Sequence, residues 1–137
     1  EYEMELTLDG VRQHGTILQL AVANGRTIGG GVPIAPDAVL NDGKLDVVIA
    51  PVQSTVDLVG ALIALGFGRH SESENVVMHQ AGEIEIRTEP SMVWSVDGEV
   101  LKPMKRVNFE VMPNAFRLVA TAEAPAFMPA TARGAAP

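Results

Sequence analysis

The stretch VVMHQAGEIEIRTEPSMVWSVDGEVLKPMKRVNFEVMP, residues 76–113, decides the fold class. Short runs in which polar and apolar residues alternate are separated by Gly, Pro and Asp-Gly, as in strands joined by tight turns. The pattern predicts strands over 76–82, 83–89, 92–96 and 107–113, with AFRLVA (115–120) as a closing strand. Many short strands at close spacing are typical of an antiparallel sandwich or barrel.

Further strand signals lie in the first fifty residues. Residues 2–8 alternate strictly between apolar and polar side chains, which predicts a strand with one buried and one solvated face. The run GTILQLAVAN, residues 15–24, becomes wholly apolar toward its end, and KLDVVIA contains an apolar strand from Leu45 to Ile49. Continuous apolar runs of this kind are typical of strands covered on both faces.

One helix is predicted, in STVDLVGALIALGFG, residues 54–68. Ser54 followed by Asp57 resembles a capping box, and Gly66 or Gly68 supplies the end. The apolar residues between them cover more than one face, so we expect the helix to be packed deeply. The expected fold class is therefore mainly β: a two-layer antiparallel β-sandwich with one principal helix.

Length and composition fit one domain with a substantial core. The chain has 137 residues, of which 47% are hydrophobic, so we expect a domain over 1–120 and a disordered, Ala- and Pro-rich tail over 121–137. There is no cysteine, which excludes a disulfide framework and a thiolate nucleophile. The formal net charge of −7 disfavours binding to nucleic acid.

We expect the chain to be a piece of a longer polypeptide, because it starts abruptly at a predicted strand and without a methionine. No stretch has the pattern of a signal peptide or the length of a membrane span. We therefore expect a cytoplasmic location.

The dipeptide Asp-Gly occurs three times, as Asp9-Gly10, Asp42-Gly43 and Asp97-Gly98. Between alternating runs it is typical of a two-residue hairpin turn, because both residues tolerate positive φ. From the local residues alone, Glu99 is a solvated hairpin residue and Asp42 stabilises a turn with its own side chain. The run Gly29, Gly30 and Gly31 predicts a loop, either flexible or closely approached by a ligand or neighbouring domain.

Five motifs in a fixed order carry a family resemblance. They are VANG (22–25), GGGVPIAPDA (29–38), NDGKLDVVI (41–49), GFGRH (66–70) and VDGE (96–99). Together they resemble the C-terminal half of the bacterial diacylglycerol kinase and lipid kinase family, which is related to sphingosine kinases. The match runs from about Leu6 to about Val119, most of the chain.

The resemblance implies a two-domain enzyme. In such kinases an N-terminal domain with a GGDGT signature binds the phosphates of ATP, and a C-terminal β-sandwich completes the cleft. This chain contains neither GGDGT nor a GxxxxGK[ST] motif. It is therefore expected to be the C-terminal domain, inactive by itself, with the N-terminal kinase domain as its partner.

By the same resemblance, Glu99 accepts the proton of the substrate hydroxyl as the general base. Asp97 forms the turn or supports Glu99, while Asn24 and the Gly29–Gly31 loop lie near the cleft and the substrate. Phosphoryl transfer needs such positioning and charge neutralisation more than covalent chemistry by the protein. The predicted helix could also line a groove for acyl chains, although packing on the sandwich is the preferred interpretation.

The resemblance also implies a cation site at VLNDGKL, built from the Asp42 carboxylate and the main-chain oxygens of Val39 and Lys44. Mg²⁺ and Ca²⁺ prefer such hard oxygen ligands. A single carboxylate suggests a structural or regulatory ion, and the plain turn stays an equal alternative.

The function implied is transfer of the γ-phosphate of ATP to a lipid hydroxyl such as that of diacylglycerol, with Mg²⁺ as cofactor. Peripheral contact with the inner membrane face would accompany a lipid substrate, and the unpaired edges of a sandwich also permit a homodimer. The alternative is a non-catalytic β-sandwich binding or interaction module.

Overall fold

The computed structural model describes residues 1–51, 76–121, 124 and 127, and ten strands make up most of that part of the chain. They are β1 Tyr2–Leu8, β2 Val11–Ala23, β3 Thr27–Ile28, β4 Val32–Pro33, β5 Leu45–Pro51, β6 Val77–Ala81, β7 Glu83–Met92, β8 Ser95–Val96, β9 Glu99–Val100 and β10 Met104–Glu110. A 3-10 turn, η1 Gly29–Gly31, joins β3 to β4. The predicted mainly β, antiparallel fold class is confirmed.

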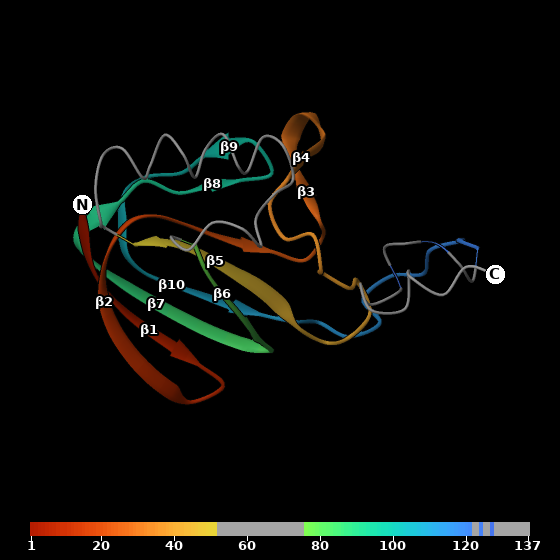
Figure 1. Ribbon diagram of the computed structural model, residues 1–137, viewed down its shortest axis with the longest axis horizontal. Helices are drawn as coiled ribbons and strands as arrows, with labels where there is room; N and C mark the ends of the chain where they lie inside the picture. Colours follow the sequence, from red (N-terminus) through yellow and green to blue (C-terminus); the bar gives the residue numbers. More distant parts are fainter. Residues whose placement is uncertain (52–75, 122–123, 125–126, 128–137) are drawn as a thin grey trace.

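Six strands form one antiparallel sheet in the order β10-β7-β1-β2-β5-β6 (Figure 1). The first half of β2 pairs with β1 and its second half pairs with β5, with a register shift between Ile17 and Gln19. Only Gly82 separates β6 from β7, yet β6 lies beside β5 and β7 lies between β1 and β10. The sheet must therefore curl until its two halves face each other, which gives a sandwich-like domain.

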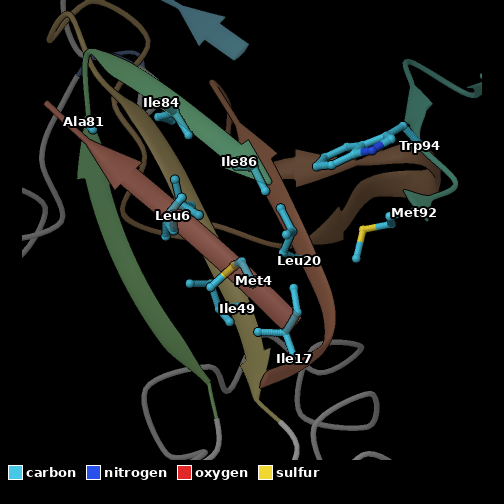
Figure 2. Packing of buried hydrophobic residues seen from close by; sticks show 11 residues of the cluster. Met4, Leu6, Ile17, Leu20, Ile49, Ala81, Ile84, Ile86, Met92 and Trp94 are labelled. Atoms are coloured by element: carbon cyan, nitrogen blue, oxygen red, sulfur yellow. The ribbon is translucent and has the colours of Figure 1, made fainter. Parts of the chain in front are cut away.

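The main core lies between these two halves, as Figure 2 shows. Met4 and Leu6 of β1 are buried, while Glu3 before them and Glu5 between them are not, so the predicted half-buried strand is confirmed. The other members of the core come from four strands and the residues after β7. They are Ile17, Leu20, Val47, Ile49, Ala81, Ile84, Ile86, Met92 and Trp94.

A second, smaller core explains why β5 is apolar on both faces. Val48 packs there with Ile34, Ala35 and Ala38 from the segment that follows β4. The strand predicted from Leu45 to Ile49 is confirmed and extends to Pro51.

The strand predicted over 115–120 is wrong. Among the described residues β10 is the last strand, and Asn114 enters a turn with a φ of 58°. Phe116 and Leu118 are 71% and 59% exposed, so this apolar run has no described strand beside it to pair with. The helix predicted over 54–68 and most of the tail predicted over 121–137 lie outside the described residues.

Candidate functional site

Glu99 lies on the short β8–β9 hairpin that follows β7. Val96 is opposite Glu99 in the register, and Asp97 and Gly98 form the turn between them. Both turn residues have positive φ, 49° and 92°, as a type I′ turn requires. The hairpin predicted at Asp97-Gly98 is confirmed, and its tight turn fixes the position of Glu99 on the backbone.

The base of this hairpin is fastened to the core. The N–H of Leu101 donates to the carbonyl oxygen of Trp94 at 2.8 Å, and the Trp94 side chain is buried. Its ring centroid lies 6.0 Å from that of Phe109 on β10. The hairpin therefore begins at the core residue Trp94, and the hydrogen bond from the exposed Leu101 returns its other end to that residue.

Glu99 is exposed and makes no hydrogen bond or ion pair with any other residue that the structure describes. Its neighbours Val96 and Val100 are 48% and 74% exposed. An open carboxylate on a fixed hairpin, flanked by exposed apolar side chains, can take a proton from a group brought to it.

The glycine-rich segment forms a second projecting ribbon. Asn24 is exposed just after β2, and β3 and β4 pair across η1, with a φ of 78° at Gly31. Arg26 fastens the ribbon: its Nε donates to the carbonyl oxygen of Ala38 at 2.8 Å. Figure 1 shows this ribbon and the β8–β9 hairpin at the same, upper side of the molecule. No hydrogen bond or ion pair joins the β3–β4 ribbon to the β8–β9 hairpin within the described residues. That the two line one cleft therefore stays a prediction.

The Asp42-Gly43 turn lies elsewhere. A Cβ placed on Gly82 would approach the Gly43 carbonyl oxygen to 3.4 Å, so this turn packs against the corner where β7 begins. Glu99 follows the opposite end of β7, ten residues later at Met92. At 3.3 Å per residue the two ends of this ten-residue strand lie roughly 30 Å apart. The structure thus divides the predicted site residues into two groups.

The Asp42-Gly43 turn also has its own geometry. The Lys44 N–H donates to Oδ1 of Asp42 at 2.9 Å, and the Asp42 N–H donates to the Val39 carbonyl oxygen at 3.5 Å. Only Gly43 has positive φ, 75°. This is the turn expected from an Asx hydrogen bond, so a type I′ geometry holds at the other two Asp-Gly pairs but not here.

The oxygens of this turn fit Mg²⁺ or Ca²⁺ in chemical type, because carboxylate and carbonyl oxygens are hard ligands and a carbonyl has two lone pairs. No group of three or more His, Cys, Asp or Glu side chains is placed to hold a metal ion in the described part of the chain. An ion at Asp42 would therefore depend on the carbonyls of Val39 and Lys44 and on water.

Asp46 is a buried carboxylate that the sequence reasoning missed. It is 4% exposed on β5 and accepts a hydrogen bond from Nε2 of Gln80 at 2.9 Å. Burial raises the pKa of Asp46 above its ordinary value, and the charges of Asp42 and Asp37 act in the same direction. A lone acidic residue within the apolar run LDVVIA was the available signal.

A charged surface on the outer side of β1, β2, β7 and β10 was also missed. Arg87 contacts Glu85 at 2.7 Å and Glu5 at 3.7 Å, and Lys105 contacts Glu89 at 2.6 Å. Arg87, Glu5, Lys105 and Glu89 help to line a cavity of about 480 Å³. Arg87 and Glu85 both lie on β7, whereas the pairs of Arg87 with Glu5 and of Lys105 with Glu89 join neighbouring strands, which supports a structural role.

The comparisons with known proteins identify the family. Residues 1–120 match the family described as the YegS C-terminal NAD kinase beta sandwich-like domain. The chain belongs to this family.

Relatives of this YegS-type domain bear lipid kinase names. A "Probable lipid kinase YegS-like" of Pectobacterium atrosepticum is 36% identical over 101 residues, which cover 74% of this chain and 32% of the relative. A protein of the same name from Shewanella frigidimarina is 29% identical over 130 residues, 95% of this chain and 41% of the relative. The chain thus spans less than half the length of these relatives.

Solved structures show the same fold. A chain from Bacillus anthracis str. Sterne superposes with a TM-score of 0.69 at 22% identity, over 84% of this chain and 38% of that one. A crystal structure of a diacylglycerol kinase from the same organism gives a TM-score of 0.57 at 20% identity, over 80% of this chain and 40% of that one. Within the described residues, no helix has the length and hydropathy needed to cross a membrane.

Proposed function

We propose that this chain is the acceptor-side domain of an ATP-dependent lipid kinase, with Glu99 as the general base. The observation that carries the proposal is the exposed Glu99 carboxylate, held just beyond a type I′ turn and without a partner among the described residues. The family and the names of its relatives support a lipid kinase. A lipid hydroxyl such as that of diacylglycerol is the acceptor that we infer.

The proposed step conserves atoms and charge. Glu99 takes the proton of the lipid hydroxyl while that oxygen forms a bond to the γ-phosphorus of ATP, and the bond to the leaving ADP oxygen breaks. Mg²⁺ bound with ATP would supply neutralisation of the phosphate charge. Val96, which is exposed and lies opposite Glu99 in the register, would offer apolar surface next to the hydroxyl, whereas Val100 faces the other side of the hairpin.

The partners follow from the length of the relatives. ATP would be held mainly by an N-terminal domain of the same polypeptide, with Asn24 and the Gly29–Gly31 segment near the interdomain cleft. Asp97 holds the turn that presents Glu99. We place the enzyme in the cytoplasm, in peripheral contact with the membrane that contains its substrate.

A separate cation is proposed at Asp42, with the carbonyl oxygens of Val39 and Lys44 as further ligands. Because the turn packs where β7 begins and the Glu99 hairpin follows the other end of that strand, the ion would stabilise the domain rather than contact the reacting phosphate.

The test is a kinase assay on the complete polypeptide with labelled ATP, Mg²⁺ and a panel of lipids in mixed micelles. Glu99→Gln should lower kcat by about 10²–10⁴-fold, the usual contribution of a general base, with an unchanged fold. Glu110→Gln, which changes an exposed glutamate on β10, is the matched control and should keep wild-type activity. Full activity of Glu99→Gln would remove the general-base assignment, and no transfer to any lipid by a folded, ATP-binding protein would favour the non-catalytic module.

A further inference from the structure

Two of the Asp-Gly turns, far apart in the sequence, meet at one glycine. Oδ1 of Asp9 accepts hydrogen bonds from the N–H groups of Gly82 at 3.0 Å and Glu83 at 2.9 Å. The Asp9 N–H in turn donates to the Glu83 carbonyl oxygen at 3.0 Å. Three hydrogen bonds therefore connect Asp9 to Gly82 and Glu83, where the chain passes from β6 to β7.

The other side of this corner supports the Asp42-Gly43 turn. A Cβ on Gly82 would lie 3.4 Å from the Gly43 carbonyl oxygen and 3.7 Å from Oδ1 of Asp9, so Gly82 is packed between the two turns. Leu45, two residues after Gly43, pairs with Ala81 in the β5–β6 ladder. The sheet thus fixes Leu45, where the chain leaves the turn, and Gly43 in the middle of the turn packs against Gly82.

The carboxylate of Asp9 is not needed for its own turn. Asp9 and Gly10 have φ values of 46° and 84°, a type I′ pair that Asn-Gly or Gly-Gly forms equally well. What the carboxylate adds is a charge-assisted acceptor for two N–H groups more than seventy residues away.

We propose that Asp9 is a positioning residue for the Asp42-Gly43 turn: by fixing Gly82, it sets the place of the oxygens that would bind the cation. This inference rests on the cation site proposed above. Residues that orient the ligands of a metal commonly change its affinity by about 10–100-fold when they are replaced.

Three variants of the complete polypeptide separate the effect of the Asp9 hydrogen bonds from the effect of the Asp9-Gly10 turn. Asp9→Gly removes the carboxylate but keeps a residue that tolerates positive φ, whereas Asp9→Asn keeps both the turn and an acceptor oxygen. Asp97→Gly is the matched control, because it makes the same change at the same place of a type I′ turn with no side-chain hydrogen bond among the described residues.

Two measurements are made on each variant. Calorimetric titration with MgCl₂ and with CaCl₂ gives the cation affinity, and amide hydrogen exchange at Lys44, whose N–H donates to Asp42, reports the turn without metal. We expect Asp9→Gly to weaken cation binding by about tenfold and to speed exchange at Lys44. Asp9→Asn should restore both values, and Asp97→Gly should change neither.

The outcomes distinguish the two proposals. Unchanged exchange and unchanged affinity in Asp9→Gly would overturn the positioning role. Affinity that is unaffected by Asp42→Ala, or absent in the wild-type protein, would overturn the cation site itself, and exchange at Lys44 would still decide whether Asp9 positions the turn.

Discussion

The N–H of Leu101 donates to the carbonyl oxygen of Trp94 across 2.8 Å, which closes the hairpin that carries Glu99 onto a buried side chain. Six residues, 95–100, thus project from a fixed base. The ring centroids of Trp94 and Phe109 lie 6.0 Å apart with the ring planes at 54°, so this aromatic pair helps to hold the base of the hairpin on the core.

Trp94→Ala should lower the free energy of unfolding by about 3–5 kcal/mol, because it leaves a cavity beneath the hairpin. Trp94→Phe should cost much less, since Nε1 of Trp94 has no hydrogen-bond partner among the described residues and no bond is lost. Urea unfolding followed by circular dichroism measures both, as Trp94 is the sole tryptophan and its fluorescence is lost in the variants. Equal losses in the two variants would contradict this account.

Gly98→Ala tests the turn itself. A φ of 92° is unfavourable for a residue with a Cβ, so the variant should lose about 1–2 kcal/mol of stability and present Glu99 less accurately. Gly15→Ala is the control, because its φ is not positive and an added Cβ meets nothing within 4 Å. Thermal unfolding and kcat of the complete polypeptide should both fall for Gly98→Ala only.

Thr88→Val should stabilise the protein by about 1 kcal/mol. Oγ1 of Thr88 is buried without a hydrogen-bond partner among the described residues, and removing such a hydroxyl recovers its desolvation cost. Thr16→Val, which removes a hydroxyl that donates to Glu3 at 3.3 Å, should not stabilise. The midpoint of urea unfolding, at an unchanged m-value, decides between the two.

Asp46→Asn should stabilise the protein at neutral pH but not in acid. Burial raises the pKa of Asp46 in the folded protein, so above the unfolded value of 3.8 the unfolded chain ionises first and folding becomes less favourable as the pH rises. Asn cannot ionise, and its side-chain oxygen can still accept from Gln80. The Tm difference between variant and wild type should be near zero at pH 3 and positive at pH 7; a difference that is the same at both values would contradict the prediction.

Local patterns predicted most strands, because the alternation of a half-buried strand depends only on which face meets water, as in β1. Local patterns failed at 115–120, because an apolar run becomes a strand only where a neighbouring strand has a free edge, and the run itself contains no information about that neighbour. They also could not predict the crossing of β2 between the two halves of the sheet, since the register shift after Ile17 leaves no mark in composition.

The candidate site was predictable only in its hairpin. The Asp97-Gly98 turn is set by neighbouring residues, whereas the contacts of Asp9 depend on Gly82 and Glu83, more than seventy positions later. The sequence reasoning therefore treated Asp9 as a turn residue alone. Asp46 was missed for a related reason: only the tertiary fold brings Gln80 to it.

The pairing of β1 with β7 has a consequence for folding during synthesis. Glu3 is opposite Glu89, so the amino-terminal strand gains β2 early but must wait for more than eighty further residues before its other edge is covered. At about 5–20 residues per second this takes roughly 4–16 s. In that time β5 extends the β1–β2 hairpin once residue 51 has been synthesised, but β7 does not yet cover the free edge of β1, which carries Met4 and Leu6. The edge of β1 that pairs with β7 is thus completed only when residue 89 is available, so this domain closes late in its own synthesis.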